Sequence, residues 1–370
     1  MMTRRCSFCI LPANLPGITL DENGKCNYCQ EFESHYMTKT SMSAEETKKR
    51  FESLVEKLRR KGGYECLVPL SGGKDSSYVL YEIVKTYNMK ALAFNFDNGF
   101  RCNEAVRNIE ALVDKLGVDL IQFKLSRDMM NKLFKTFLQR AGEFCTPCNM
   151  LIGLMGVRIA KQYGLKAIMT GNSQYMTPGL GGVSPATYFD RAYYFNVIRG
   201  LIDFNEVRDY VVPPYTTMAL QRIIGSRPQV IDVLEYLRPS ISHIHDVLTK
   251  QLAWKQPGGD IQHGDCMLNA IKDYLMYKKW QCTEVTAVYS AGCRTGEFSR
   301  QEALEKALSE ECTEVPGILP HFLEQLGMTE AEFEEASNKH FTDIPNVRSK
   351  WFFQIAKKAV MKIESLKGRR

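Results

Sequence analysis

The most distinctive chemical feature of the chain is the polar loop Ser71-Gly72-Gly73-Lys74-Asp75-Ser76-Ser77. It follows an apolar run typical of a buried strand and opens a segment typical of a helix. Glycines let the backbone approach an anion, free amides at a helix start bind it, and serine hydroxyls and a lysine ammonium add donors and charge. The loop therefore predicts a phosphate-binding site. It differs from the Walker A pattern, because no earlier glycine precedes Lys74 at the required distance.

Four of the twelve cysteines form two closely spaced pairs, Cys6-x-x-Cys9 and Cys26-x-x-Cys29. Two such knuckles supply four thiolates to one ion, which is the arrangement of a structural zinc ribbon. Four thiolates leave no open coordination position. We therefore expect a structural zinc ion and not a catalytic one.

A third pair, Cys145-Thr146-Pro147-Cys148, stands just before a predicted helix. That helix leads to a strand of the sheet that also carries the phosphate loop, so we expect both thiols to face the same cleft. A structural metal pair and two buried thiols are the alternative interpretations.

A regular alternation of elements must position these residues. Short apolar runs at 65–70, 89–96, 118–125 and 165–171 indicate buried strands, and the stretches at about 75–87, 103–116, 128–142 and 149–163 indicate helices. This order predicts a parallel, doubly wound α/β sheet, in which ligands bind beyond the carboxyl ends of the strands. Phe96-Asp97 and Gly171-Asn172 stand at two such ends and extend the candidate site to a nucleotide cleft.

Four regions are expected along the chain: a zinc ribbon over 1–35, a linking helix over 36–62, the α/β domain over 63–190 and a mainly helical substrate region over 191–370. Three capping boxes support the helices: Ser43 with Glu46, Ser299 with Glu302, and Thr329 with Glu332. A basic helix is predicted at 348–367, and residues 173–190 are expected to form a loop that faces the substrate.

The composition limits the class of protein. With 370 residues, 44% hydrophobic, 24% charged and a net charge of +6, the chain is typical of a soluble globular protein of about two domains. It shows no apolar run of the ~18 residues that a membrane span needs, and its first residues do not form a signal peptide, so we expect a cytoplasmic protein and no membrane partner. In that compartment, twelve cysteines favour metal or thiol chemistry over disulfides.

The motif SGGKDS resembles the pyrophosphatase loop of the PP-loop ATPases. The resemblance implies a sheet of the adenine nucleotide alpha hydrolase (HUP) type and a reaction in which ATP, with Mg²⁺, adenylates a substrate oxygen and releases pyrophosphate. Ser71 to Ser77 would then hold the phosphates, with Ser71, Lys74 and Asp75 as catalytic candidates. Phe96, Asp97, Gly171 and Asn172 correspond to contacts with the nucleotide.

The pair Cys145 and Cys148 is similar to the CxxC of PP-loop tRNA thiolases. In that family the pair and one distant cysteine bind a [4Fe–4S] cluster, whose open iron carries sulfide. The resemblance implies that Cys145 and Cys148 are cluster ligands with a catalytic role. Cys266, Cys282, Cys293 and Cys312 are candidates for the third ligand; Cys266 is preferred because it lies in a polar loop ahead of a helix, and Cys293 is second.

The segment CSFCILPANLPGITLDENGKCNYC, together with SGGKDSS and SAGCRTGEFSRQEALEKA, resembles the N-acetyl sugar amidotransferase family over nearly the whole chain. That family is taken to form an amidine on a sugar, with ammonia from a separate glutaminase. The stretch TGNSQYMTPGLGG departs from the family, at a place where the substrate should be read.

Three functions follow from these patterns. The favoured one is adenylation of a carbonyl oxygen followed by its replacement by sulfur, on a small molecule or a tRNA and with a possible sulfur-donor protein. The alternative is amidination of an N-acetyl sugar with a glutaminase partner. The third is a zinc-ribbon adaptor that binds RNA, which would bind in a salt-sensitive way without releasing pyrophosphate. A homodimer is compatible with each.

Overall fold

The computed structural model describes residues 4–37, 42–173, 190–257, 264–311 and 313–345. The chain forms two compact units, and each is described by itself. The first unit comprises Met1–Phe123, Ala167–Ser184 and Val230–Pro320, and the second comprises Lys124–Lys166, Pro185–Gln229 and His321–Arg370.

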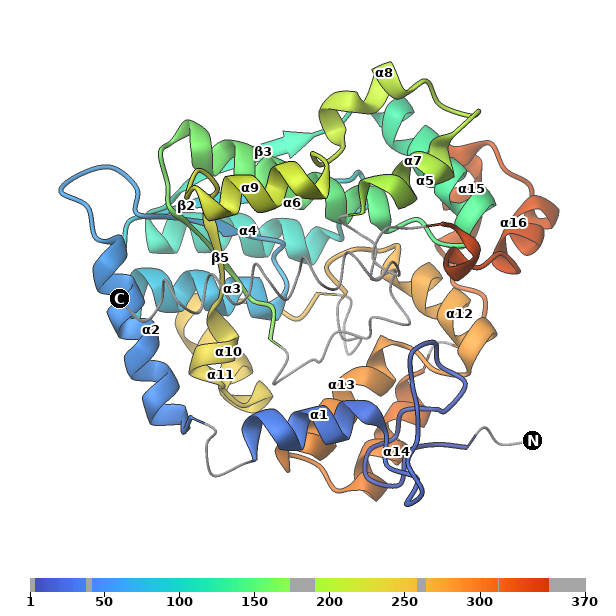
Figure 1. Cartoon of the computed structure of the whole chain (residues 1–370), viewed down its shortest axis with the longest axis horizontal. Coiled ribbons are helices and arrows are strands. Elements are labelled where there is room, and N and C mark those ends of the chain that lie inside the picture. Colours follow the sequence, from blue (N-terminus) through green and yellow to red (C-terminus); the bar gives the residue numbers. More distant parts are fainter. Residues whose placement is uncertain (1–3, 38–41, 174–189, 258–263, 312, 346–370) are drawn as a thin grey trace. The chain divides into compact units, whose positions relative to one another are not determined.

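A five-stranded sheet has the order β3-β2-β1-β4-β5. Figure 1 labels its strands β2, β3 and β5. The strands are β1 (Cys66–Pro69), β2 (Ala91–Asp97), β3 (Asp119–Lys124), β4 (Ala167–Thr170) and β5 (Gln229–Asp232). β1 pairs in parallel with β2, with Cys66 opposite Ala91, and in parallel with β4, with Leu67 opposite Ile168. The chain runs outward from β1 to β3 and then returns to the other side of β1. This creates a topological switch point between β1 and β4, which is where doubly wound sheets bind ligands.

The first unit contains the helices that follow β1 and β2 in the sheet, and further helices before β1 and after β5. They are α1 (Asn27–Tyr36), α2 (Ala44–Leu58), α3 (Lys74–Tyr81) with a π-helical continuation at Glu82–Thr86, α4 (Asn103–Leu116), α10 (Val233–Leu237), α11 (Ile241–Leu252), α12 (Asn269–Trp280), α13 (Glu284–Thr295) and α14 (Arg300–Glu310). α15 (Leu319–Leu326) crosses the boundary between the units. The core beneath the phosphate loop joins Val68 of β1 and Leu70, just after it, to Leu248 of α11 and to Trp254.

The second unit has an aromatic core of its own. Its helices are α5 (Arg127–Ala141), α6 (Thr146–Gln162), α7 (Arg191–Ile198), α8 (Phe204–Val207), α9 (Tyr215–Ile223) and α16 (Glu330–Ser337), with short 3-10 turns at Arg208–Tyr210 and Phe341–Asp343. Phe134 packs edge-on against Phe144 and Phe322, and Phe137 does the same against Tyr193 and Tyr194.

The predicted alternation of strands and helices over residues 65–171 is confirmed, and with it the doubly wound α/β fold. All three capping boxes are present, with each cap hydroxyl accepting the backbone N–H three residues later. The strand β5 was not anticipated, because four residues inside a mainly helical region are too few to show strand periodicity. The predicted basic helix at 348–367 and most of the loop at 173–190 lie outside the described residues. Over the described ranges, no helix is both long and apolar enough to cross a bilayer.

Candidate nucleotide site and cysteine cluster

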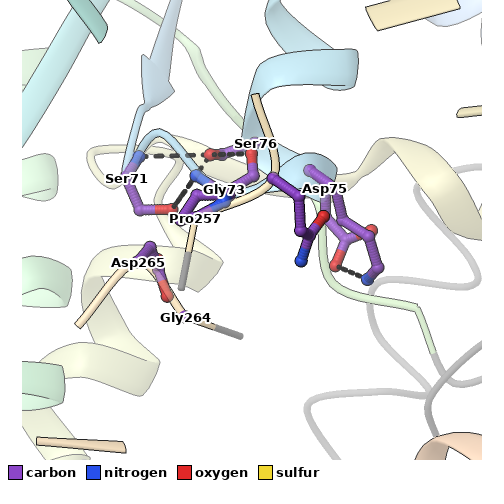
Figure 2. A pocket seen from close by; sticks show the side chains of 9 residues that line it. Ser71, Gly73, Asp75, Ser76, Pro257, Gly264 and Asp265 are labelled. Carbon is purple, nitrogen blue, oxygen red and sulfur yellow. Dashed lines mark hydrogen bonds and ion pairs between the residues drawn. The ribbon is translucent and has the colours of Figure 1, made fainter. Parts of the chain in front are cut away.

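The phosphate loop joins the end of β1 to the first turn of α3 and is held by its own serines (Figure 2). The backbone N–H of Ser71 donates to Ser76 Oγ at 3.1 Å, and that of Gly73 donates to Ser71 Oγ at 3.3 Å. The hydroxyls of Ser71 and Ser76 lie 3.0 Å apart. Because α3 begins directly at Lys74, its positive N-terminal end lies at this loop.

Two buried side chains hold the loop from the inside. Trp254 Nε1 and Asn108 Nδ2 donate to the carbonyl oxygen of Gly72 at 2.9 and 3.1 Å. Asn108 also bonds the backbone of Lys255 in both directions, so the segment after α11 is tied to α4 and to the loop together. Neither Trp254 nor Asn108 was anticipated as part of the site, because their sequence surroundings give no sign of this contact.

Close backbone approach explains two glycines of the site. Gly72 has φ +84°, and a Cβ there would lie 2.4 Å from the carbonyl oxygen of Ala105. A Cβ on Gly171 would lie 3.0 Å from both the backbone carbon and Cβ of Asp75. The structure thus brings Gly171, at the end of β4, against the first turn of α3.

A pocket opens over the loop. Its lining consists of loop residues and of residues that follow α11: Ser71, Gly73, Lys74, Asp75, Ser76, Gln256, Pro257, Gly264 and Asp265. Polar groups dominate this lining. The pocket suits the phosphates of a nucleotide.

Two carboxylates and one ammonium group line the pocket. Lys74 Nζ lies 2.8 Å from Asp75 Oδ2, and the lysine side chain is only 8% exposed. Within the described part of the chain, Asp75 Oδ1 is buried with no hydrogen-bond partner. Asp265 faces Gly73, with Oδ2 3.3 Å from the position that a Gly73 Cβ would take.

Two carboxylates would repel a polyphosphate unless a cation lay between them. Mg²⁺ prefers carboxylate and phosphate oxygens, so Asp75 and Asp265 are the side chains of this pocket that fit a magnesium ion carried by ATP. Asp265 was missed in the sequence; the signal was its place next to Cys266.

Backbone pairing holds Asp265 and Cys266 beside the start of α4. Met267 N–H donates to Phe100 O at 2.9 Å, Cys102 N–H donates to Asp265 O at 3.2 Å, and Arg101 and Cys266 form an antiparallel bridge. Asn98 Nδ2 lies 3.3 Å from Cys266 Sγ. Burial raises the pKa of the Cys266 thiol. Cys266 therefore lies one residue from the phosphate pocket.

The other third-ligand candidates lie elsewhere or are not described. Cys282 is fully buried, and its pKa is raised by burial. Cys293 lies near the N-terminal cysteines, since Cys9 and Cys6 act on its pKa. Cys312 lies outside the described residues. Of the three that the structure describes, Cys266 is the one that lies beside the pocket.

The remaining strand-end candidates make local contacts. Phe96 stacks with Phe123 at a ring distance of 5.9 Å. Asp97 accepts the backbone N–H of Gly99 at 2.8 Å and pairs with Arg101 at 3.1 Å, so this carboxylate stabilises the turn after β2. Asn172 contacts Asp232, whose pKa is raised by burial. Their roles toward a nucleotide remain predictions.

The pair Cys145 and Cys148 lies at the start of α6 in the second unit, and both side chains are half-buried. Glu143 fixes this turn by accepting the Thr146 backbone N–H at 3.0 Å and the Tyr193 hydroxyl at 2.9 Å. Burial raises the pKa of Glu143. Because the units are described separately, the position of this pair beside the phosphate loop remains a prediction.

Two further titratable groups respond to the charge of Lys74. His245, on α11, lies 5.6 Å from the Trp254 ring, and burial and then the Lys74 charge lower its pKa. Burial raises the pKa of Glu297, whereas Lys74 and a backbone bond from Ile241 act in the opposite direction. His245 stood in no motif. Glu297 lies within the segment SAGCRTGEFSRQEALEKA, but it was not singled out there.

The four N-terminal cysteines form one buried cluster. Their Sγ atoms all lie within 4.8 Å of one another, with separations of 3.5 Å for Cys26–Cys29, 3.8 Å for Cys9–Cys26 and 4.0 Å for Cys6–Cys29. A tetrahedral ion with Zn–S bonds of about 2.3 Å requires sulfurs about 3.8 Å apart. The cluster therefore fits a single tetrahedral ion such as zinc.

Comparisons with known proteins point to two kinds of relative. Residues 259–361 match the family model described as "LPS biosynthesis protein WbpG-like, C-terminal domain". Two uncharacterized proteins of Methanocaldococcus jannaschii are also similar. One is 31% identical over 45% of this chain and 58% of its own length, and the other is 23% identical over 57% and 71%. The chain thus spans less than two thirds of the first of these relatives.

Among solved structures, the U34-tRNA thiolase NcsA from Methanococcus maripaludis with its [4Fe–4S] cluster is 15% identical, with a TM-score of 0.34, over 86% of this chain and 99% of that one. The NH3-dependent NAD synthetase from Campylobacter jejuni is 9% identical, with a TM-score of 0.29, over 57% and 94%. Such values carry no argument about function. The chain thus combines a doubly wound α/β sheet, with a glycine- and serine-rich loop between β1 and α3, and a C-terminal segment that matches the WbpG-like domain model.

Proposed function

We propose that this protein adenylates a carbonyl oxygen of its substrate with ATP, releases pyrophosphate and replaces the activated oxygen by another atom. The observation that supports this most directly is the serine-rich loop at the start of α3, whose pocket holds Lys74 and lies beside Gly171 at the switch point of the sheet. Magnesium bound with ATP would neutralise phosphate charge there, and Asp75 and Asp265 are the side chains that would hold it.

In the proposed reaction, the loop amides and Lys74 bind the phosphates and align the α-phosphorus with the substrate oxygen. The oxygen attacks phosphorus, the bond to the β-phosphate breaks, and pyrophosphate leaves with its charge stabilised by the same amides and by Lys74. A nucleophile then attacks the adenylated carbon and AMP departs.

For the delivered atom, two candidates have separate support. The WbpG-like match, which includes Asp265 and Cys266, favours nitrogen, with an N-acetylated sugar of lipopolysaccharide biosynthesis as acceptor and ammonia from a glutaminase partner. The half-buried Cys145 and Cys148 and the place of Cys266 beside the pocket favour sulfur, on a small molecule or a tRNA. We favour nitrogen, because the WbpG-like model matches a defined segment of this chain, residues 259–361. An RNA-binding adaptor would use the N-terminal cysteine cluster and the basic segment at 348–367; the cluster is present, and the basic segment lies outside the described residues.

The test is the set of products formed from ATP in the presence of nucleotide-linked N-acetyl sugars or tRNA. We expect AMP and pyrophosphate, loss of both in Lys74→Ala, and full activity in Lys250→Ala, an exposed lysine of α11. ADP and phosphate as products would contradict the proposal. Ammonium or sulfide supplied separately then distinguishes the two candidates, because exchange of oxygen for nitrogen or for sulfur changes the product mass in opposite directions.

A further inference from the structure

The carboxylate of Glu235 joins two parts of the first unit that are far apart in the sequence. Glu235 lies on α10, directly after β5 (Figure 1). The hydroxyl of Tyr36, the last residue of α1, donates to Glu235 Oε1, and Ser173 Oγ donates to Glu235 Oε2 at 3.0 Å. One carboxylate therefore bridges the N-terminal segment and the backbone that leaves β4.

The first side of this bridge begins at the cysteine cluster. Cys26 is the N-cap of α1 and Cys29 lies in its first turn, so the start of this helix carries two of the four clustered sulfurs. Phe32, which is buried, packs against the ring of Tyr36 at a centroid distance of 4.9 Å. Because a short helix is stiff, an ion that fixes the cluster also fixes the direction of α1 and the place of Tyr36.

The segment that carries Glu235 is held in place by contacts on several sides. Thr47 Oγ1 of α2 donates to Tyr236 O at 2.9 Å. Arg238, at the end of α10, lies with its guanidinium carbon 5.0 Å from the centroid of the Tyr36 ring, and its Nε donates to Glu235 O at 3.2 Å. Arg238 has φ +46°, a left-handed conformation that disfavours a residue with a Cβ. Such a conformation persists only where the surrounding contacts hold it, and it is typical of segments whose geometry serves a function.

The second side of the bridge ends at the phosphate pocket. Ser173 is 5% exposed and lies three residues beyond the end of β4. Two residues before it, Gly171 lies against Asp75, since a Cβ on Gly171 would be 3.0 Å from Asp75 Cβ. Asp75 in turn pairs with Lys74 at 2.8 Å. The short stretch 171–173 therefore connects Glu235 to the charged side chains of the pocket.

We propose that Glu235 is a positioning residue that couples metal binding at the N-terminal cysteines to nucleotide binding at the phosphate loop. An ion in the cluster fixes α1, so that Tyr36 meets one oxygen of Glu235 while the other oxygen holds Ser173, and with it Gly171, against the loop. Loss of the ion frees the start of α1 and removes this support. The inference rests on the proposed function only in that the pocket binds ATP; it requires neither the acceptor nor the delivered atom.

The test measures the affinity of the full-length protein for MgATP by calorimetry, with zinc bound and after a zinc-selective chelator has removed it. In the wild type, zinc removal should weaken MgATP binding by about fivefold or more. Tyr36→Phe and Ser173→Ala each remove one hydroxyl of the bridge, so both should show a comparable loss with zinc still bound. Zinc removal should then add less than about twofold in either variant. Ser34→Ala, which removes an exposed hydroxyl of α1, is the control and should behave as the wild type.

The reverse titration checks the same coupling from the metal side. Because coupling between two binding sites is reciprocal, added MgATP should raise the zinc affinity of the wild type by the same factor and leave that of Tyr36→Phe nearly unchanged. Competition with a chelator at equilibrium measures this affinity. A structural defect alone would lower both affinities without removing their dependence on each other.

The outcomes separate this proposal from the proposed function. An equal effect of zinc on MgATP binding in the wild type and in Tyr36→Phe, or no effect in either, would overturn the coupling and leave the ATP site intact. If the zinc-free protein precipitates, the zinc-bound variants decide, since unchanged MgATP affinity in both Tyr36→Phe and Ser173→Ala would refute the role of Glu235. A wild type that does not bind MgATP would overturn both proposals.

Discussion

Asp265 faces Gly73 across the phosphate pocket, with its Oδ2 3.3 Å from the place where a Gly73 side chain would begin. A carboxylate in this position opposes the binding of a bare polyphosphate and favours a phosphate that carries a cation. The backbone of Asp265 and its neighbours pairs with residues 100–102 at the start of α4. This pairing fixes the position of the Asp265 backbone beside the pocket.

The first prediction concerns Asp265→Asn. Because the amide removes one negative charge, ATP without magnesium should bind more tightly than to the wild type. The concentration of Mg²⁺ needed for half-maximal ATP binding should rise, because a cation ligand is lost. Calorimetric titration with and without Mg²⁺ measures both effects. Asp246→Asn, on the exposed side of α11, is the control and should change neither. Equal losses of affinity in both titrations would show that Asp265 only supports the loop.

The second prediction separates close approach from backbone strain. Gly72→Ala would place a Cβ 2.4 Å from Ala105 O at a left-handed φ of +84°, whereas Gly99→Ala, at φ +88°, meets nothing within 4 Å. Strain alone costs about 1 kcal/mol or somewhat more for a non-glycine residue there. We expect Gly99→Ala to lower the free energy of unfolding by about that amount, and Gly72→Ala to lower it further and abolish ATP binding. Urea denaturation measures the free energy of unfolding of both variants. Equal decreases in Gly72→Ala and Gly99→Ala would contradict the close approach of Gly72 to Ala105.

The phosphate loop and its strand were predictable because both signals are local. Glycines and serines at a strand-to-helix junction act through their own backbone amides, and the apolar run before them is long enough to indicate β1. The four knuckle cysteines were predictable for the same reason, since the spacing within each pair already sets the ligand geometry.

The residues that complete the pocket could not be predicted, because they act across the fold. Asp265 reaches the loop through pairing of its own segment with residues 100–102, and Trp254 reaches Gly72 through the packing of α11. Such contacts depend on which helices and strands pack against each other. A short stretch of sequence does not determine that packing. Cys266 was considered as a candidate ligand because it is a cysteine in a polar loop ahead of a helix, and not because the sequence showed that this loop lies beside the pocket.

The third prediction follows from the lowered pKa of His245. Burial and the Lys74 charge lower the pKa of this imidazole, so the unfolded chain binds a proton near pH 6.5 that the folded chain resists. His245 should therefore reduce stability as the pH falls below about 6.5, and the reduction should disappear above it. The difference in unfolding free energy between wild type and His245→Gln, measured from pH 5 to pH 8, should show this slope. In Lys74→Met, the pKa of His245, followed by NMR, should rise. A fall of this pKa would contradict the electrostatic effect of Lys74 on His245.

The last prediction tests whether Trp254 and Asn108 hold the loop together. Both donate to the Gly72 carbonyl, so each single loss leaves that oxygen with one donor, whereas losing both leaves it buried without any. A single hydrogen bond contributes about 1 kcal/mol net, but an unsatisfied buried carbonyl costs about 1–3 kcal/mol. Trp254→Phe and Asn108→Ala together should therefore weaken ATP binding by more than the sum of their separate effects. Thr249→Ala, which removes an exposed hydroxyl of α11, serves as the control and should combine additively with either variant. Strict additivity of Trp254→Phe and Asn108→Ala would mean that water reaches the Gly72 oxygen, and that the loop is held by its serines alone.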